Sequence, residues 1–261
     1  GGPAVLVLED LSTRFPRGAE NSLRQMTVDE IRAAVRWLAG FHAHFWESPQ
    51  ASERGLWARG SYWILDELGR RQLADAPATF SNRYIEEGEW QRLRAAAEAI
   101  DARLSGGPAS AARFRTLIHG DAKPANILCS AAWGHPDVEC AFLDFSWTGE
   151  GYGTYDLMYL LWGEWTQVDV DRALEEYYAA LVPKLPHGAD GYTPEVLRRH
   201  FEFCVLDLLR WWVGFERGQH FWAMPWALDT LRTVLRRLDG GQVGLPPEAY
   251  AKALDREFPL P

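Results

Sequence analysis

Residues His119–Leu128 read HGDAKPANIL, and a short distance downstream Phe142–Phe145 read FLDF. These two runs hold the densest concentration of reactive side chains in the sequence, and they decide the fold to expect. Asp121 and Asn126 lie at the two ends of a loop that a proline interrupts, so both side chains can project into the same space. A turn after the first run would place Asp144 beside them. The sequence therefore predicts that three oxygen-bearing side chains converge.

The chemistry of these side chains points to phosphoryl transfer. Carboxylate and amide oxygens are hard ligands that suit Mg²⁺, which keeps water and substrate phosphates in its remaining positions. Lys123, two residues beyond Asp121, would place a positive charge where a phosphoryl group is transferred. Positioning and neutralisation of charge carry most of the catalysis in such reactions.

The sequence pattern around the two runs predicts a mainly helical α+β fold. A capping box at Thr27–Glu30 stands just before an apolar periodic run and marks the start of a helix. Short strands are expected at residues 5–8, 116–118, 126–129 and 139–145. Helices are expected at residues 28–46, 89–104, 154–163, 170–182, 194–217, 226–239 and 247–257.

The composition excludes several classes of protein. Of the 261 residues, 47% are hydrophobic and 24% are charged, which is ordinary for a globular chain and unlike a disordered one. The net charge of -9 argues against binding to nucleic acid. No apolar run approaches the roughly 18 residues of a membrane span, and no signal peptide is recognisable. Three cysteines without CxxC spacing predict neither disulfides nor a zinc site, and so a reducing, cytoplasmic location.

The pattern His-x-Asp-x-Lys-x-x-Asn followed by Asp-Phe resembles the catalytic and metal-binding loops of the protein-kinase-like superfamily. The glycine between His119 and Asp121 is similar to the aminoglycoside phosphotransferase and choline-kinase-like branch. Three further segments resemble its ecdysteroid-kinase-like (CHK kinase-like) members: Val5–Leu11 their hinge, Leu38–Ala43 the helix after it, and Tyr155–Leu157 the start of the helix behind the metal loop. The resemblance implies an ATP- and Mg²⁺-dependent kinase that phosphorylates a hydroxyl of a small molecule.

The same resemblance implies roles for the residues of the two runs. Asp121 would be the catalytic base that orients the acceptor hydroxyl, and Lys123 would contact the γ-phosphate. His119 would support the catalytic loop from behind. Asn126 and Asp144 would be the Mg²⁺ ligands.

Two other places carry roles on the same ground. The main chain of Glu9 and Leu11 would pair with adenine. Asp156 would brace the catalytic loop, although an aspartate just before an apolar run is also typical of a plain helix N-cap.

The resemblance also divides the chain. Residues 1–15 would be the hinge strand and a linker from an N-terminal lobe that is missing from this chain. Residues 16–261 would form the helical C-terminal lobe, with the catalytic and metal loops in 116–147 and the acceptor-side helices in 154–261.

Two rival functions stay open at this point. The missing lobe motivates the first, a non-catalytic pseudokinase or regulatory binding module. The second is a metal-dependent phosphohydrolase that uses the same carboxylates without ATP. Metal sites of that class usually include histidine at two or more positions, and only His119 is near.

Other conspicuous side chains have a structural interpretation. His42 and His44 lack a cysteine or carboxylate at metal-ligand spacing, so they are expected to be structural. An aromatic concentration in the C-terminal helices is expected chiefly to pack helices together, while some of its rings could line the acceptor pocket. Its members are Trp211, Trp212, Phe215, Phe221, Trp222 and Trp226.

Overall fold

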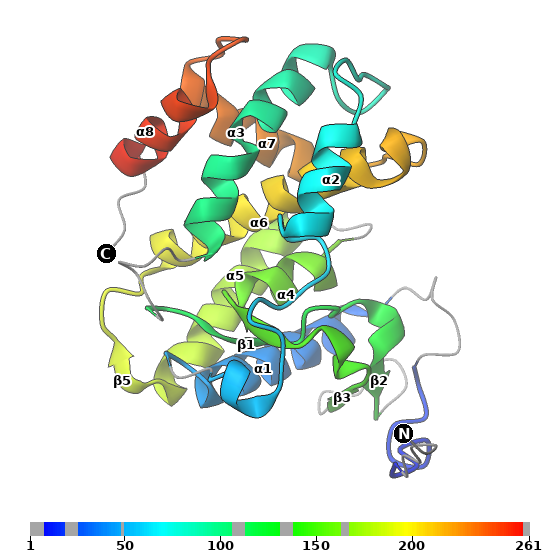
Figure 1. Cartoon of the computed structure of the whole chain (residues 1–261). Coiled ribbons are helices and arrows are strands. Elements are labelled where there is room, and N and C mark those ends of the chain that lie inside the picture. The colour runs from blue at the N-terminus through cyan, green and yellow to red at the C-terminus, as the bar shows by residue number, and fades with distance from the viewer. Residues whose placement is uncertain are drawn as a thin grey trace.

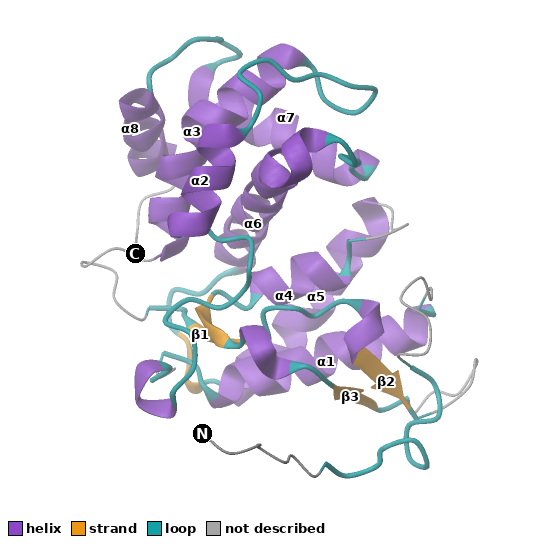
Figure 2. Cartoon of the chain, turned by 45° about the vertical axis from the view of Figure 1, so that its right-hand side comes forward, coloured by secondary structure: helices purple, strands orange, loops and turns teal. Residues whose placement is uncertain are grey.

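A computed structural model describes residues 8–18, 26–47, 50–105, 113–130, 138–162 and 167–257. Within these ranges the helices are α1 (Val28–His44), α2 (Glu67–Asp75), α3 (Glu87–Ser105), α4 (Thr154–Leu160), α5 (Gln167–Leu181), α6 (Pro194–Gly214), α7 (Pro225–Asp239) and α8 (Pro247–Glu257). The strands are β1 (Thr116–Ile118), β2 (Ile127–Cys129), β3 (Cys140–Phe142), β4 (Gly149–Gly151) and β5 (Pro186–Ala189). The expected mainly helical α+β class is confirmed (Figures 1 and 2).

Helix α1 begins as its sequence predicts. Thr27 Oγ1 accepts a hydrogen bond from Glu30 N at 3.3 Å, and Glu30 Oε2 accepts one from Thr27 N at 2.8 Å. These two bonds form the expected capping box and satisfy main-chain donors at the helix start. The apolar stripe, which includes Val35 and Leu38, is buried, and α1 packs along α5.

The strands form two antiparallel pairs, β1 with β4 and β2 with β3. The strand expected at residues 139–145 is shorter than predicted, because Asp144 adopts a left-handed conformation with φ of 60° and Phe145–Trp147 form a 3-10 turn. Cys129 and Cys140 face each other across β2 and β3 without a disulfide between them, and their sulfur atoms lie 3.5 Å apart. The hairpin of β2 and β3 thus joins the loop that carries Asn126 to the loop that carries Asp144.

Helix α6 connects the two halves of the molecule. It packs against α2, α3 and α7, which lie with α8 in the upper part of Figure 1, and against α4 and α5 below them. One continuous core of buried side chains runs from Met26 to Leu254. The expected packing role is confirmed for Trp211, Phe221 and Trp226, which are buried, and Trp212 and Trp222 lie partly buried against the same core.

Most expected elements are present. All seven predicted helices lie within three residues of their expected ends. Helix α2 was not predicted, because its nine residues are mostly polar and include few apolar side chains; Asp66 begins it by accepting a hydrogen bond from Gly69 N at 2.8 Å. The strand expected at residues 5–8 lies outside the described residues except for Leu8, which is in no strand. Across the described ranges, no helix is both long and apolar enough to cross a membrane.

Candidate functional site

The loop between β1 and β2 gathers three of the predicted site residues. Lys123 Nζ donates to Asp121 Oδ2 at 2.8 Å, and Asn126 Nδ2 donates to the same oxygen at 2.9 Å and to the Asp121 main-chain oxygen at 2.9 Å. Asp121 is only 3% exposed. Its second carboxylate oxygen, Oδ1, is buried and has no hydrogen-bond partner among the described residues. A buried carboxylate oxygen without a partner is costly, so it marks a place where a ligand could donate a hydrogen bond.

Lys123 remains charged in this setting. Partial burial acts against the ammonium group, but the hydrogen bond and the negative charge of Asp121 outweigh it and raise the pKa of Lys123. Tyr159 and Asp144 raise the pKa further. The site therefore holds a fixed positive charge that is felt by both predicted carboxylates.

His119 links the loop between β1 and β2, which we call the catalytic loop after its expected role, to the loop after β3 that carries Asp144, which we call the metal loop. Its Nδ1 accepts a hydrogen bond from Asp121 N at 3.2 Å, so we assign the ring proton to Nε2, which donates to the Leu143 main-chain oxygen at 2.8 Å. Leu143 N in turn donates to the Asn126 main-chain oxygen at 2.9 Å. Leu143 directly precedes Asp144, so these bonds fix one loop relative to the other.

Asp144 is exposed, and its surroundings favour the ionised form of its carboxylate. Ser146 Oγ donates to Asp144 Oδ1 at 2.6 Å, and this bond is the main reason why the pKa of Asp144 is lowered. The nitrogen of the Asn126 amide is bound to Asp121, which leaves its oxygen as the atom for a cation. Among the described residues no three His, Cys, Asp or Glu side chains are grouped to hold a metal. One carboxylate and one amide oxygen still fit Mg²⁺, which takes its other ligands from water and phosphate.

Asp156 holds the catalytic loop from below. It is 1% exposed; its Oδ2 accepts from His119 N at 2.7 Å and its Oδ1 from Gly120 N at 2.9 Å. The N-cap of α4 is Gly153, so the plain N-cap interpretation of Asp156 is wrong. These bonds fit the bracing role that the resemblance implied.

His42 extends this support, which sequence reasoning missed. His42 is fully buried, with Nε2 3.1 Å from Asp156 Oδ2 and Nδ1 2.8 Å from Tyr177 Oη. The expected structural role holds, but His42 acts on the catalytic loop through Asp156. The sequence signal for this role was the position of His42 on the buried apolar stripe of α1. Its partner on α5, Tyr177, could not be predicted from the sequence.

Gly120 lies at the tightest point of the catalytic loop. Its φ is +83°, and a Cβ placed there would lie 2.2 Å from the main-chain oxygen of Trp147 and 2.8 Å from Ser61 N. Both contacts are with main chain, which cannot rotate away as a side chain could. Only glycine therefore fits between the catalytic loop and the metal loop.

Gly120→Ala is expected to lower the free energy of unfolding by about 2–4 kcal/mol, because left-handed strain and overpacking add. Urea denaturation followed by circular dichroism would measure the loss. Gly240→Ala is the matched control, since Gly240 has φ of +65° and no atom within 4 Å of a new Cβ, so it adds strain alone. Equal losses in the two variants would contradict the tight contact.

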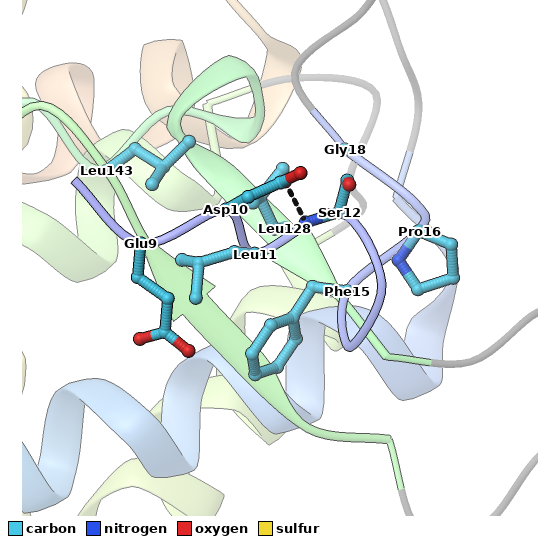
Figure 3. Close-up of a pocket in the computed structure, with 9 residues that line it drawn as sticks. All are labelled: Glu9, Asp10, Leu11, Ser12, Phe15, Pro16, Gly18, Leu128 and Leu143. Carbon is cyan, nitrogen blue, oxygen red and sulfur yellow. Dashed lines mark hydrogen bonds between the residues drawn. The ribbon is translucent and has the colours of Figure 1, made fainter. Parts of the chain in front are cut away.

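A cavity of about 440 Å³ lies between the N-terminal segment and the β2–β3 hairpin (Figure 3). Glu9 and Leu11 line it, as do Leu128 in β2 and Leu143 beside Asp144. The Leu11 carbonyl accepts hydrogen bonds from within its own turn, from Arg14 N at 3.1 Å and from Phe15 N at 2.8 Å, so the Leu11 N–H is the group that Leu11 could offer to a ligand. Sequence reasoning missed Leu128 and Leu143 because both stand in apolar runs that also fit plain strands.

The comparison with known protein families agrees with the chemistry expected at this site. The family model described as "Phosphotransferase enzyme family" (APH) matches residues 8–192. This range includes every predicted site residue. A search of curated proteins gives no match.

Proposed function

The chain belongs to the phosphotransferase enzyme family, and from this premise we propose that it transfers the γ-phosphoryl group of ATP to a hydroxyl of a small molecule. One observation carries the proposal. Asp121 is a buried carboxylate with one oxygen held by Lys123 and Asn126 and the other left without a partner. Such a group can accept the hydrogen bond of an acceptor hydroxyl and then its proton.

Each residue of the site has its own role in the proposed reaction. The acceptor oxygen forms the new bond to phosphorus as its proton moves to Asp121, and the bond from phosphorus to the ADP oxygen breaks. Lys123 offsets negative charge on the transferred group. Asn126 and Asp144 would hold Mg²⁺, which neutralises the charge of the phosphates. His119 and Asp156 keep the loops in register through the hydrogen bonds described above.

The cavity beside the site would hold the base of the nucleotide. Leu128 and Leu143 offer an apolar surface for a flat ring, and the main chain of Glu9 and Leu11 lies across from them. Leu143 directly precedes Asp144, and Leu128 follows Asn126 by two residues. A nucleotide whose base lies in this cavity would therefore have its phosphates near both proposed metal ligands.

The proposal is tested by transfer of labelled γ-phosphate from ATP to a panel of alcohols, with the purified protein. Transfer that needs both Mg²⁺ and an alcohol is the expected result. Binding of ATP with Mg²⁺ and no transfer to any alcohol would favour the non-catalytic alternative. Release of phosphate from a monoester without nucleotide would favour the phosphohydrolase.

Leu128→Ala is expected to weaken ATP binding by roughly four- to twelvefold, since the variant removes roughly half of a buried leucine's contribution of 1.5–3 kcal/mol. Titration with a fluorescent ATP analogue would measure the dissociation constant. Leu68→Ala is the control, because Leu68 is 53% exposed and lies outside the cavity. If the two variants bind ATP equally well, the base does not occupy this cavity.

A further inference from the structure

Aromatic side chains continue from the metal loop into the segment that precedes α2. The rings of Trp57 and Trp147 stack with their centroids 5.7 Å apart and 21° between their planes. Tyr62 follows, 5.5 Å from Trp147, and the Tyr62 hydroxyl lies 2.5 Å from that of Tyr159. We call these four residues the aromatic wall. Behind it, Trp211 in α6 packs edge-on against Tyr62 at 5.5 Å.

The outer part of the aromatic wall is exposed but held in place. Trp57 is 55% exposed and Trp147 is 36% exposed, whereas Trp211 behind them is 9% exposed. Trp57 Nε1 donates to the Ser146 main-chain oxygen at 2.7 Å, which fixes the indole to the metal loop. One face of Trp57 is stacked on Trp147, so much of the rest is open. A rigid, open indole face is a preorganised surface for another flat ring.

The aromatic wall begins beside the catalytic carboxylate. The Trp147 main-chain oxygen accepts a hydrogen bond from Ser61 N at 3.0 Å and lies against Gly120, the residue before Asp121. Burial raises the pKa of both Tyr62 and Tyr159, and the negative charge of Asp121 raises both further. The inner end of the wall is therefore close enough to Asp121 to feel its charge.

The acidic side chains behind the aromatic wall are already paired. Asp101 accepts from Arg59 Nη2 at 2.8 Å and from Leu65 N at 3.3 Å, and so holds the segment that carries Trp57. Asp207 in α6 accepts from Arg210 at 2.7 Å. Both carboxylates are buried. Their charge is neutralised within the protein, so they are not offered to a polycationic acceptor.

We propose that the aromatic wall binds the acceptor of the reaction and selects alcohols whose hydroxyl is carried on a flat, apolar ring system. The inference rests on the proposed function, since it assigns the acceptor side of the same site. The ring would stack on the face of Trp57 that Trp147 leaves open, and the hydroxyl would reach towards Asp121 past Tyr62 and Tyr159.

The test uses two probe alcohols of similar size, 2-naphthylethanol, which is flat, and its saturated decahydro analogue, which is puckered. Calorimetric titration of the purified protein with ATP analogue and Mg²⁺ present should show at least tenfold tighter binding of the flat alcohol. Trp57→Ala should remove most of that preference, about tenfold in affinity, because stacking is lost. Leu68→Ala, at a side chain of similar exposure, should keep it.

The results separate this inference from the proposed function. Binding that prefers the flat alcohol and depends on Trp57, but is followed by no phosphoryl transfer, would support the proposed role of the aromatic wall. It would contradict the proposed kinase activity. Phosphorylation of choline or kanamycin that is indifferent to Trp57→Ala supports the kinase activity and overturns the aromatic wall. Equal binding of the flat and puckered alcohols also overturns it. Trp147→Leu is a second variant that should reproduce the effect of Trp57→Ala.

Discussion

Asp121→Asn is expected to lower the rate of phosphoryl transfer by about 10²- to 10⁴-fold, the range that a general base contributes. Asparagine has nearly the shape of aspartate but cannot take the proton of the acceptor hydroxyl. It can still accept hydrogen bonds from Lys123 and Asn126 through its one carbonyl oxygen, so the loop should keep its conformation. The loss should therefore fall on the turnover number more than on the affinity for ATP.

Steady-state kinetics with the preferred alcohol measure this loss, and circular dichroism and urea denaturation check the fold. Asp229→Asn is a suitable control, since this carboxylate is 74% exposed and its ion pair with Arg232 is long, at 3.9 Å. Full turnover in Asp121→Asn would remove the assignment of the base and with it the proposed reaction. A large loss of stability would mean that the carboxylate acts mainly on the fold.

The sequence predicts the loops of the site better than what surrounds them. Asp121, Lys123 and Asn126 lie within six residues, so a proline-interrupted loop between short strands is enough to bring them together. Predicting the position of Asp144 required the pairing of β2 with β3, which the strand-like runs on both sides suggested. Local pattern therefore sufficed where the contacts are local.

The cavity and the aromatic wall could not be predicted from local sequence patterns. Leu128 and Leu143 line the cavity only because β2 and β3 pair in one register and the N-terminal segment crosses them. Trp57 and Tyr62 stand in a stretch without periodicity, and their contacts with Trp147 and Tyr159 span about 90 or more residues of sequence. Irregular segments take their conformation from tertiary contacts, which a single sequence does not display.

The hydrogen bonds of the site form one connected network. Asp156 holds the main chain of His119, whose ring binds the main chain of Leu143 beside Asp144. A change at Asp156 should therefore be felt at the catalytic loop first and at the metal loop through it. This makes Asp156 the residue whose removal tests whether the network supports the fold as well as the reaction.

Asp156→Ala is expected to lower the free energy of unfolding by about 3–5 kcal/mol, since two buried main-chain donors and the His42 ring lose their acceptor at once. Urea denaturation measures the loss. Tyr177→Phe is the graded control, because it removes one hydrogen bond at the far side of His42 and should cost about 1 kcal/mol. Asp156→Asn keeps one acceptor oxygen and should fall between the two, which preserves a measurable variant if alanine prevents folding. A loss below about 1 kcal/mol in Asp156→Ala would show that water replaces the carboxylate at little cost, and the brace would then contribute nothing to the stability of the catalytic loop.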